Sequence, residues 1–71
     1  MNHFELLKNI LGNKIDVSNL NEDDLLLDLG LDSLDLVETA LAIEEALKIE
    51  FTADEIASLN TIRDVLQIIK R

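Results

Sequence analysis

The first apolar pattern of the chain has the spacing of one helix face. Its members recur at helical intervals near the N-terminus: Phe4, Leu7, Ile10 and Leu11. This pattern predicts a helix over residues 2–12. Gly12 and Asn13 follow, and both residue types tolerate the left-handed conformation that commonly ends a helix, so we expect the helix to stop there in that conformation.

A second and longer pattern runs from Ser33 to Leu47. Its apolar positions stack at i, i+4, i+7 and i+11 and form one stripe: Leu36, Ala40, Ile43 and Leu47. The spacing predicts a helix of about four turns whose stripe is buried against the rest of the domain.

Two shorter helices are indicated by their start signals. A hydroxyl residue stands three positions ahead of an acid at Thr52 and Glu55, and again at Thr61 and Asp64, which is the pattern of a capping box. No long stretch alternates with period two, and no repeat or linker divides the chain. We therefore predict an all-α four-helix bundle, with three main helices and a short third one, as a single domain over residues 1–71.

A loop of about twenty residues separates the first two helices, between Gly12 and Asp32. Eight aliphatic residues make it too apolar for a free linker, so we expect them to pack down as an ordered loop: Ile15, Val17, Leu20, Leu25, Leu26, Leu27, Leu29 and Leu31. Ser18 or Asn21 could begin a brief helical turn that leads into Glu22 and Asp23.

Negative charge is concentrated in the middle of the chain. The 71 residues include 15 Asp and Glu against 6 Lys and Arg, a formal net charge of −9, and ten of the acids lie between residues 15 and 47 without any base. Such a chain repels the phosphates of nucleic acids and of anionic membranes, so neither is an expected partner. We expect basic protein partners and, from the high net charge, a monomer.

Several other chemistries lack their residues. There is no cysteine, His3 is the only histidine, and no G-x-S-x-G pattern is present, which argues against a catalytic zinc site and a serine hydrolase. A calcium loop with Gly30 at its sixth position would need oxygen ligands where Leu25 and Leu27 stand. We expect no metal site and no catalysis. The longest apolar run, Ala40–Ile43, and the absence of a signal pattern indicate a cytoplasmic protein without membrane insertion.

Ser33 stands at the start of the second helix, where a serine commonly caps the backbone. Asp32 is also a good capping residue and Asp35 lies in the first turn, so the Ser33 hydroxyl is not needed as a cap. It would then project near the positive end of the helix, which is a natural place for a phosphate.

The run Asp28-Leu29-Gly30-Leu31-Asp32-Ser33-Leu34-Asp35 resembles the attachment motif of the acyl carrier proteins, and the order of the predicted helices also resembles that family. The resemblance implies that Ser33 is esterified by 4'-phosphopantetheine taken from coenzyme A. It implies a carrier of acyl thioesters, without catalytic activity, in fatty-acid, lipid or polyketide synthesis. The implied partners are a phosphopantetheinyl transferase and acyl-transferring and chain-elongating enzymes with basic patches. The motif residues around the serine are Asp28, Gly30, Asp32 and Leu34.

On a helical wheel, acids of the second helix lie opposite its apolar stripe, with Leu34 and Leu41 beside them. From the residues alone, this face is either a solvated surface or a docking surface with partly exposed leucines. The resemblance implies a recognition helix that is read by basic partners. Its expected docking residues are Asp32, Asp35, Glu38, Leu41, Glu44 and Glu45.

Two alternatives and one question about cargo stay open at this point. A peptidyl or aminoacyl carrier would share the serine, although Leu31 interrupts the Gly-Gly pattern common in that class. An unmodified acidic helical bundle that only binds partners would have the same composition. Ala40 and Ala57 are small and could leave room for an acyl chain inside the bundle, or could simply allow helices to approach closely.

Overall fold

The first helix begins and ends close to its expected positions. The computed structural model describes residues 2–70, so the two end residues of the expected 1–71 domain lie outside this range. Helix α1 spans His3–Leu11, and the Asn2 side chain caps it by accepting from the Glu5 N–H at 2.8 Å. The predicted left-handed stop is wrong: Gly12 has φ −60°, and the chain continues through right-handed turns in which the Ile15 N–H still bonds to the Leu11 carbonyl.

Helix α2 spans Ser33–Leu47, as its sequence pattern predicts. Asp32 is the N-cap residue, and its carboxylate accepts from the Asp35 N–H while the Asp35 carboxylate accepts from the Asp32 N–H. This reciprocal capping box satisfies two backbone donors at the start of the helix. The helix ends at Lys48, whose φ of 58° supplies the left-handed turn.

The last two helices follow their predicted start signals. Helix α3 spans Ala53–Ala57 and has a capping box between Thr52 and Glu55. Helix α4 spans Ile62–Lys70, and Thr61 and Asp64 exchange the same two kinds of hydrogen bond. The start signals in the sequence are therefore confirmed.

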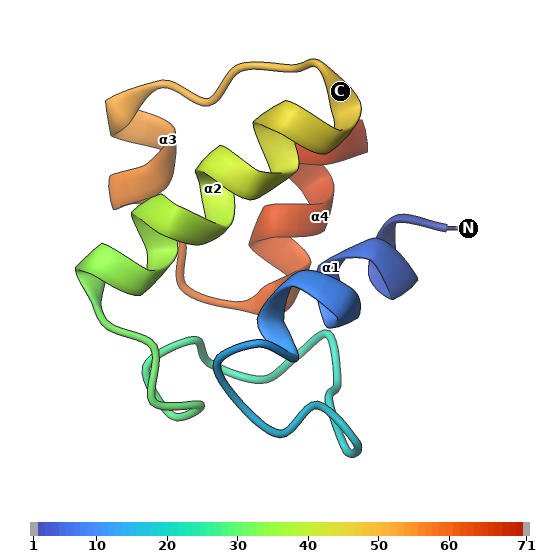
Figure 1. Cartoon of the computed structure of the whole chain (residues 1–71). Helices are drawn as coiled ribbons and strands as arrows, with labels where there is room; N and C mark the ends of the chain where they lie inside the picture. The colour runs from blue at the N-terminus through green and yellow to red at the C-terminus, as the bar shows by residue number, and fades with distance from the viewer. Residues whose placement is uncertain (1, 71) are drawn as a thin grey trace.

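Helix α1 packs against both α2 and α4, and α3 packs against α2 near its N-terminal half (Figure 1). The described residues thus form an all-helical bundle, as predicted. The short α3 contributes no buried residue, and Phe51 and Leu59 on either side of it enter the core instead. The core residues are Leu7, Leu11, Leu26, Leu31, Ala40, Ile43, Phe51, Leu59, Ile62, Val65, Leu66 and Ile69.

The long loop crosses one end of the bundle (Figure 1), and backbone hydrogen bonds hold it to the segment before α4 and to the first turn of α4. The Leu26 N–H bonds to the Asn60 carbonyl at 2.8 Å, and the Arg63 N–H bonds to the Glu22 carbonyl at 2.9 Å. Arg63 also forms ion pairs with Glu22 and Asp23. The loop is therefore ordered, as its apolar composition predicted.

Two details of this loop differ from the prediction. Leu26 and Leu31 are buried, but Leu25 and Leu27 do not pack down, and the side chain of Leu27 is 78% exposed. The Leu25–Thr61 bridge fixes the backbone so that Leu26 points inward. Asn21 begins a turn in which the Asp24 N–H bonds to its carbonyl, but no helix forms there.

Candidate functional site

Ser33 is the first residue of α2 and is exposed. The capping is done by Asp32, and within residues 2–70 the Ser33 hydroxyl makes no hydrogen bond. The backbone N–H groups of Ser33 and Leu34 also have no acceptor among the described residues. The Ser33 hydroxyl and two backbone N–H donors therefore lie together at the positive end of the helix. Such an end is a favourable place for a phosphate group.

A groove of about 510 Å³ opens beside Ser33, between α2 and α3. Every lining residue except Ser33 is apolar: Leu36 and Val37 from α2, and Ala53, Ile56 and Ala57 from α3. Of the two small residues, Ala57 is part of the groove lining. Ala40 is not, because it is 2% exposed and packs in the core away from the groove. Val37 follows the attachment motif in the sequence, and its place in the groove depends on where α3 docks.

The motif residues around Ser33 have separate roles. Gly30 has φ +89°, a conformation that side chains disfavour, and it turns the chain into the Asp32 cap. Leu34 is 65% exposed beside Ser33. Asp28 is exposed and lines a different hollow in the long loop, so the structure does not bring it to the groove at Ser33.

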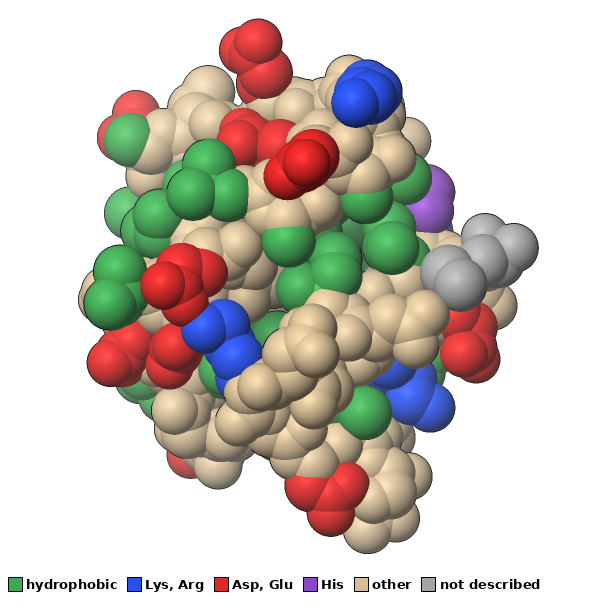
Figure 2. Space-filling view, viewed as in Figure 1, with side chains coloured by type: hydrophobic (Ala, Val, Ile, Leu, Met, Phe, Trp, Pro, Cys, Tyr) green, Lys and Arg blue, Asp and Glu red, His purple; other side chains and the backbone are tan. Residues whose placement is uncertain are grey.

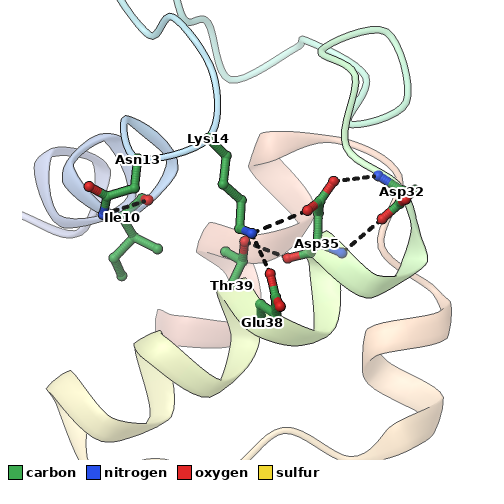
Figure 3. Close-up of polar contacts among 7 residues, drawn as sticks. All are labelled: Ile10, Asn13, Lys14, Asp32, Asp35, Glu38 and Thr39. Atoms are coloured by element: carbon green, nitrogen blue, oxygen red, sulfur yellow. Dashed lines mark hydrogen bonds and ion pairs between the residues drawn. The ribbon is translucent and has the colours of Figure 1, made fainter.

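The acidic residues of α2 are engaged to very different degrees. Asp35 and Glu38 both bond to the Lys14 ammonium, which reaches across from the turn after α1 (Figure 3). The Glu44 carboxylate accepts from the Phe51 N–H at 2.6 Å and so holds the segment before α3. Among the described residues, the Glu45 carboxylate has neither a hydrogen bond nor an ion pair.

Apolar side chains interrupt this acidic face. Leu41 is 58% exposed, and Figure 2 shows acidic and apolar side chains next to one another over the region of α2 turned toward the viewer. The exposure of Leu34 and Leu41 confirms the prediction from the helical wheel. An apolar centre with a polar rim is the usual composition of a protein–protein interface.

Electrostatics at the start of α2 favour the ionised form of Asp35. The pKa of Asp35 is lowered, first by the hydrogen bond from the Asp32 N–H and then by the one from Lys14. The pKa of Lys14 is raised, mainly by its hydrogen bond to Glu38 and then by that to Asp35. Lys14 was not among the site residues predicted from sequence; its place as the last base before the acidic segment was the only signal.

The chain gives Ser33 no chemical activation of its own. Within residues 2–70, no imidazole or other base lies within hydrogen-bond reach of its hydroxyl, and no group of three or more His, Cys, Asp or Glu residues is arranged to hold a metal ion. None of the described helices is long and apolar enough to cross a membrane. The arrangement fits a hydroxyl to which a separate enzyme attaches a chemical group.

Comparison with known proteins identifies the class. Residues 5–69 match the family model of the phosphopantetheine attachment site. The chain is 41% identical to an acyl carrier protein of Coprothermobacter proteolyticus, over 94% of this chain and 85% of that protein. It is 38% identical to one of Clostridium perfringens, over 93% and 91%. The crystal structure of an acyl carrier protein from Thermotoga maritima has the same fold, with a TM-score of 0.89 at 20% identity, covering 94% of this chain and 81% of that one.

The chain belongs to the acyl carrier protein family. Members carry acyl groups, have no catalytic activity of their own and bear a covalently bound 4'-phosphopantetheine. That group supplies a thiol on a flexible arm, where the acyl thioester forms. As a class, these proteins interact with a phosphopantetheinyl transferase and with enzymes of fatty-acid synthesis. The site fits this group, because the Ser33 hydroxyl is exposed and lies beside an apolar groove, and because neither this hydroxyl nor the two backbone amides has a hydrogen-bond partner within residues 2–70.

Proposed function

We propose that Ser33 carries the 4'-phosphopantetheine and that residues 1–71 act as a single acyl carrier domain. This proposal rests on a comparison of the hydrogen bonds made by the three serine hydroxyls. Ser18 donates to the Asp16 carboxylate and Ser58 donates to the Glu55 carbonyl at 2.9 Å, whereas the hydroxyl of Ser33 has no acceptor within the described residues. An uncommitted hydroxyl at a helix start is the one that can accept a phosphodiester without breaking a structural contact.

Modification of the whole chain by a transferase tests this proposal. The protein is incubated with coenzyme A, Mg²⁺ and a broad-specificity phosphopantetheinyl transferase, and its intact mass is measured. We expect a single phosphopantetheine, found by fragmentation on the peptide that contains Ser33. Absence of the addition, while a known carrier is modified in parallel, would contradict the proposal.

Docking of enzymes on the acidic face of α2 is the second part of the proposed function. Partners with basic patches would contact the expected residues of α2, among which Glu45 is uncompensated and Leu41 is exposed. These partners belong to fatty-acid, lipid or polyketide synthesis. The curated relatives named above are acyl carrier proteins, which favours acyl over aminoacyl cargo.

The groove between α2 and α3 gives a prediction about the cargo. Its apolar lining begins at Ser33, so a long acyl chain on the arm can turn back into it. Two buried methylenes would stabilise the domain by about 1.6 kcal/mol, which raises the Tm by about 6–13 °C for a domain of this size. Thermal melts of the octanoyl and acetyl forms check this, and equal Tm values would argue against cargo in the groove.

A further inference from the structure

Lys14 connects two parts of the molecule that are far apart in sequence. It lies in the exposed turn after α1, and its ammonium bonds to Asp35 Oδ1 at 3.2 Å and to Glu38 Oε1, both on α2 (Figure 3). The pairs span 21 and 24 residues. One lysine therefore compensates two of the acids at the Ser33 end of α2.

These two acids are also expected docking residues, so the lysine occupies the same oxygens that a basic partner would use. The other acids of α2 differ in this respect: the Glu44 carboxylate accepts from a backbone amide, and the Glu45 carboxylate has no partner among the described residues. The intramolecular cation thus acts at one end of the face only. A partner that approaches Ser33 meets carboxylates that are already paired.

We propose that Lys14 is an internal counter-ion which docking partners displace. A guanidinium or ammonium of the partner takes over Asp35 and Glu38, and the Lys14 side chain moves out to solvent. This inference rests on the docking role of α2 given above. The inference also specifies the partner's side chain. An arginine of the partner replaces the Lys14 ammonium favourably, because its planar guanidinium binds carboxylates in a bidentate manner and a lysine does not.

The physical basis is that exposed ion pairs are weak and exchange readily. A lysine ammonium on a flexible stem binds as a point charge, and its pairs on the surface are partly screened by water and salt. Exchange therefore occurs without unfolding any element. Lys14 lowers the affinity of the docked complex at the end nearest the cargo, which favours release after each transfer.

The test compares two variants that change the net charge equally. Lys14→Gln removes the internal counter-ion, whereas Lys8→Gln removes a lysine whose ammonium lies 5.7 Å from the centre of the Phe4 ring and forms no ion pair among the described residues. The phosphopantetheinyl transferase is the probe, with kcat and KM measured at one fixed ionic strength and folding checked by circular dichroism. We expect Lys14→Gln to lower KM about two- to fivefold, the range for exposed ion pairs, and Lys8→Gln to change it less.

A third variant separates the possible results. In a Glu38→Gln, Asp35→Asn background, the added Lys14→Gln change should no longer lower KM, because the lysine has no carboxylate to mask. Equal KM values for Lys14→Gln and Lys8→Gln, or an effect that persists in that background, would overturn the counter-ion role while leaving the carrier proposal intact. Failure of every variant and of the unchanged chain to be modified would instead overturn the attachment at Ser33, and this inference with it.

Discussion

We expect Ser33→Ala to abolish phosphopantetheine addition completely while leaving the Tm within about 4 °C of the unchanged chain. Asp32 provides the N-cap of α2, and the Ser33 hydroxyl makes no hydrogen bond within residues 2–70, so its removal leaves no buried group unpaired. Alanine is also a good helix former at the first position of a helix. Intact mass after transferase treatment and a thermal melt measure the two quantities independently.

Two matched controls come from the remaining serines. Ser18→Ala and Ser58→Ala each remove a hydroxyl that donates a hydrogen bond within the fold. Both variants should still be modified. If Ser33→Ala were still modified, the attachment site would lie elsewhere. If it unfolded, the hydroxyl would have a structural role that its exposed position does not suggest.

The helices were predictable because their signals are local. The capping pairs at Asp32, Thr52 and Thr61 each lie within four residues of the helix they start, and the apolar spacing of α2 reports directly which face is buried. Within the predicted stripe, Ala40 and Ile43 are buried, whereas Leu36 and Leu47 are half-buried against the core. Local hydrogen bonding and periodicity are enough to place these elements.

One of the two errors is local, and the other arises where a distant segment decides the structure. Gly12 was predicted to turn left-handed, but the chain bonds back to Leu11 and continues in a right-handed sense. In the long loop, pairing of Leu25 with Thr61 determines which leucines face inward and leaves Leu27 exposed. No local pattern distinguishes adjacent leucines, because their side chains are chemically identical.

The candidate site also has a part that could be predicted from the sequence and a part that depends on packing. Ser33 was identified because its motif is contiguous in sequence, and Leu41 because a helical wheel places it beside the acids. The unequal engagement of the docking acids could not be predicted, since Lys14 and the Phe51 amide reach them only through the packing of α1 and of the segment before α3. Charge counting treats Glu38, Glu44 and Glu45 as equivalent, and the fold makes them different.

Two substitutions on opposite faces of α2 should separate stability from docking. Ile43 is fully buried, so Ile43→Ala leaves a cavity that costs about 2–5 kcal/mol. For a domain of 71 residues, a loss of about 2 kcal/mol lowers the Tm by about 8–16 °C, so we expect the Tm to fall by at least about 8 °C. The total stability of such a chain is only about 4–11 kcal/mol, so this loss is a large fraction of it. A thermal melt followed by circular dichroism at the helix band measures this loss.

Leu41→Ala is the matched substitution, two residues away on the exposed face. Its side chain is 58% exposed, so its removal should shift the Tm by no more than about 4 °C. Because we expect Leu41 to be an apolar contact of the docking face, its truncation should raise the KM of the transferase at least about fivefold, which corresponds to a loss of about 1 kcal/mol of binding free energy. An unchanged KM would remove Leu41 from the interface, whereas a large fall in Tm would mean that its contacts within the bundle matter more than its exposure indicates. The two variants together therefore test whether α2 presents one face to the core and the other to partners.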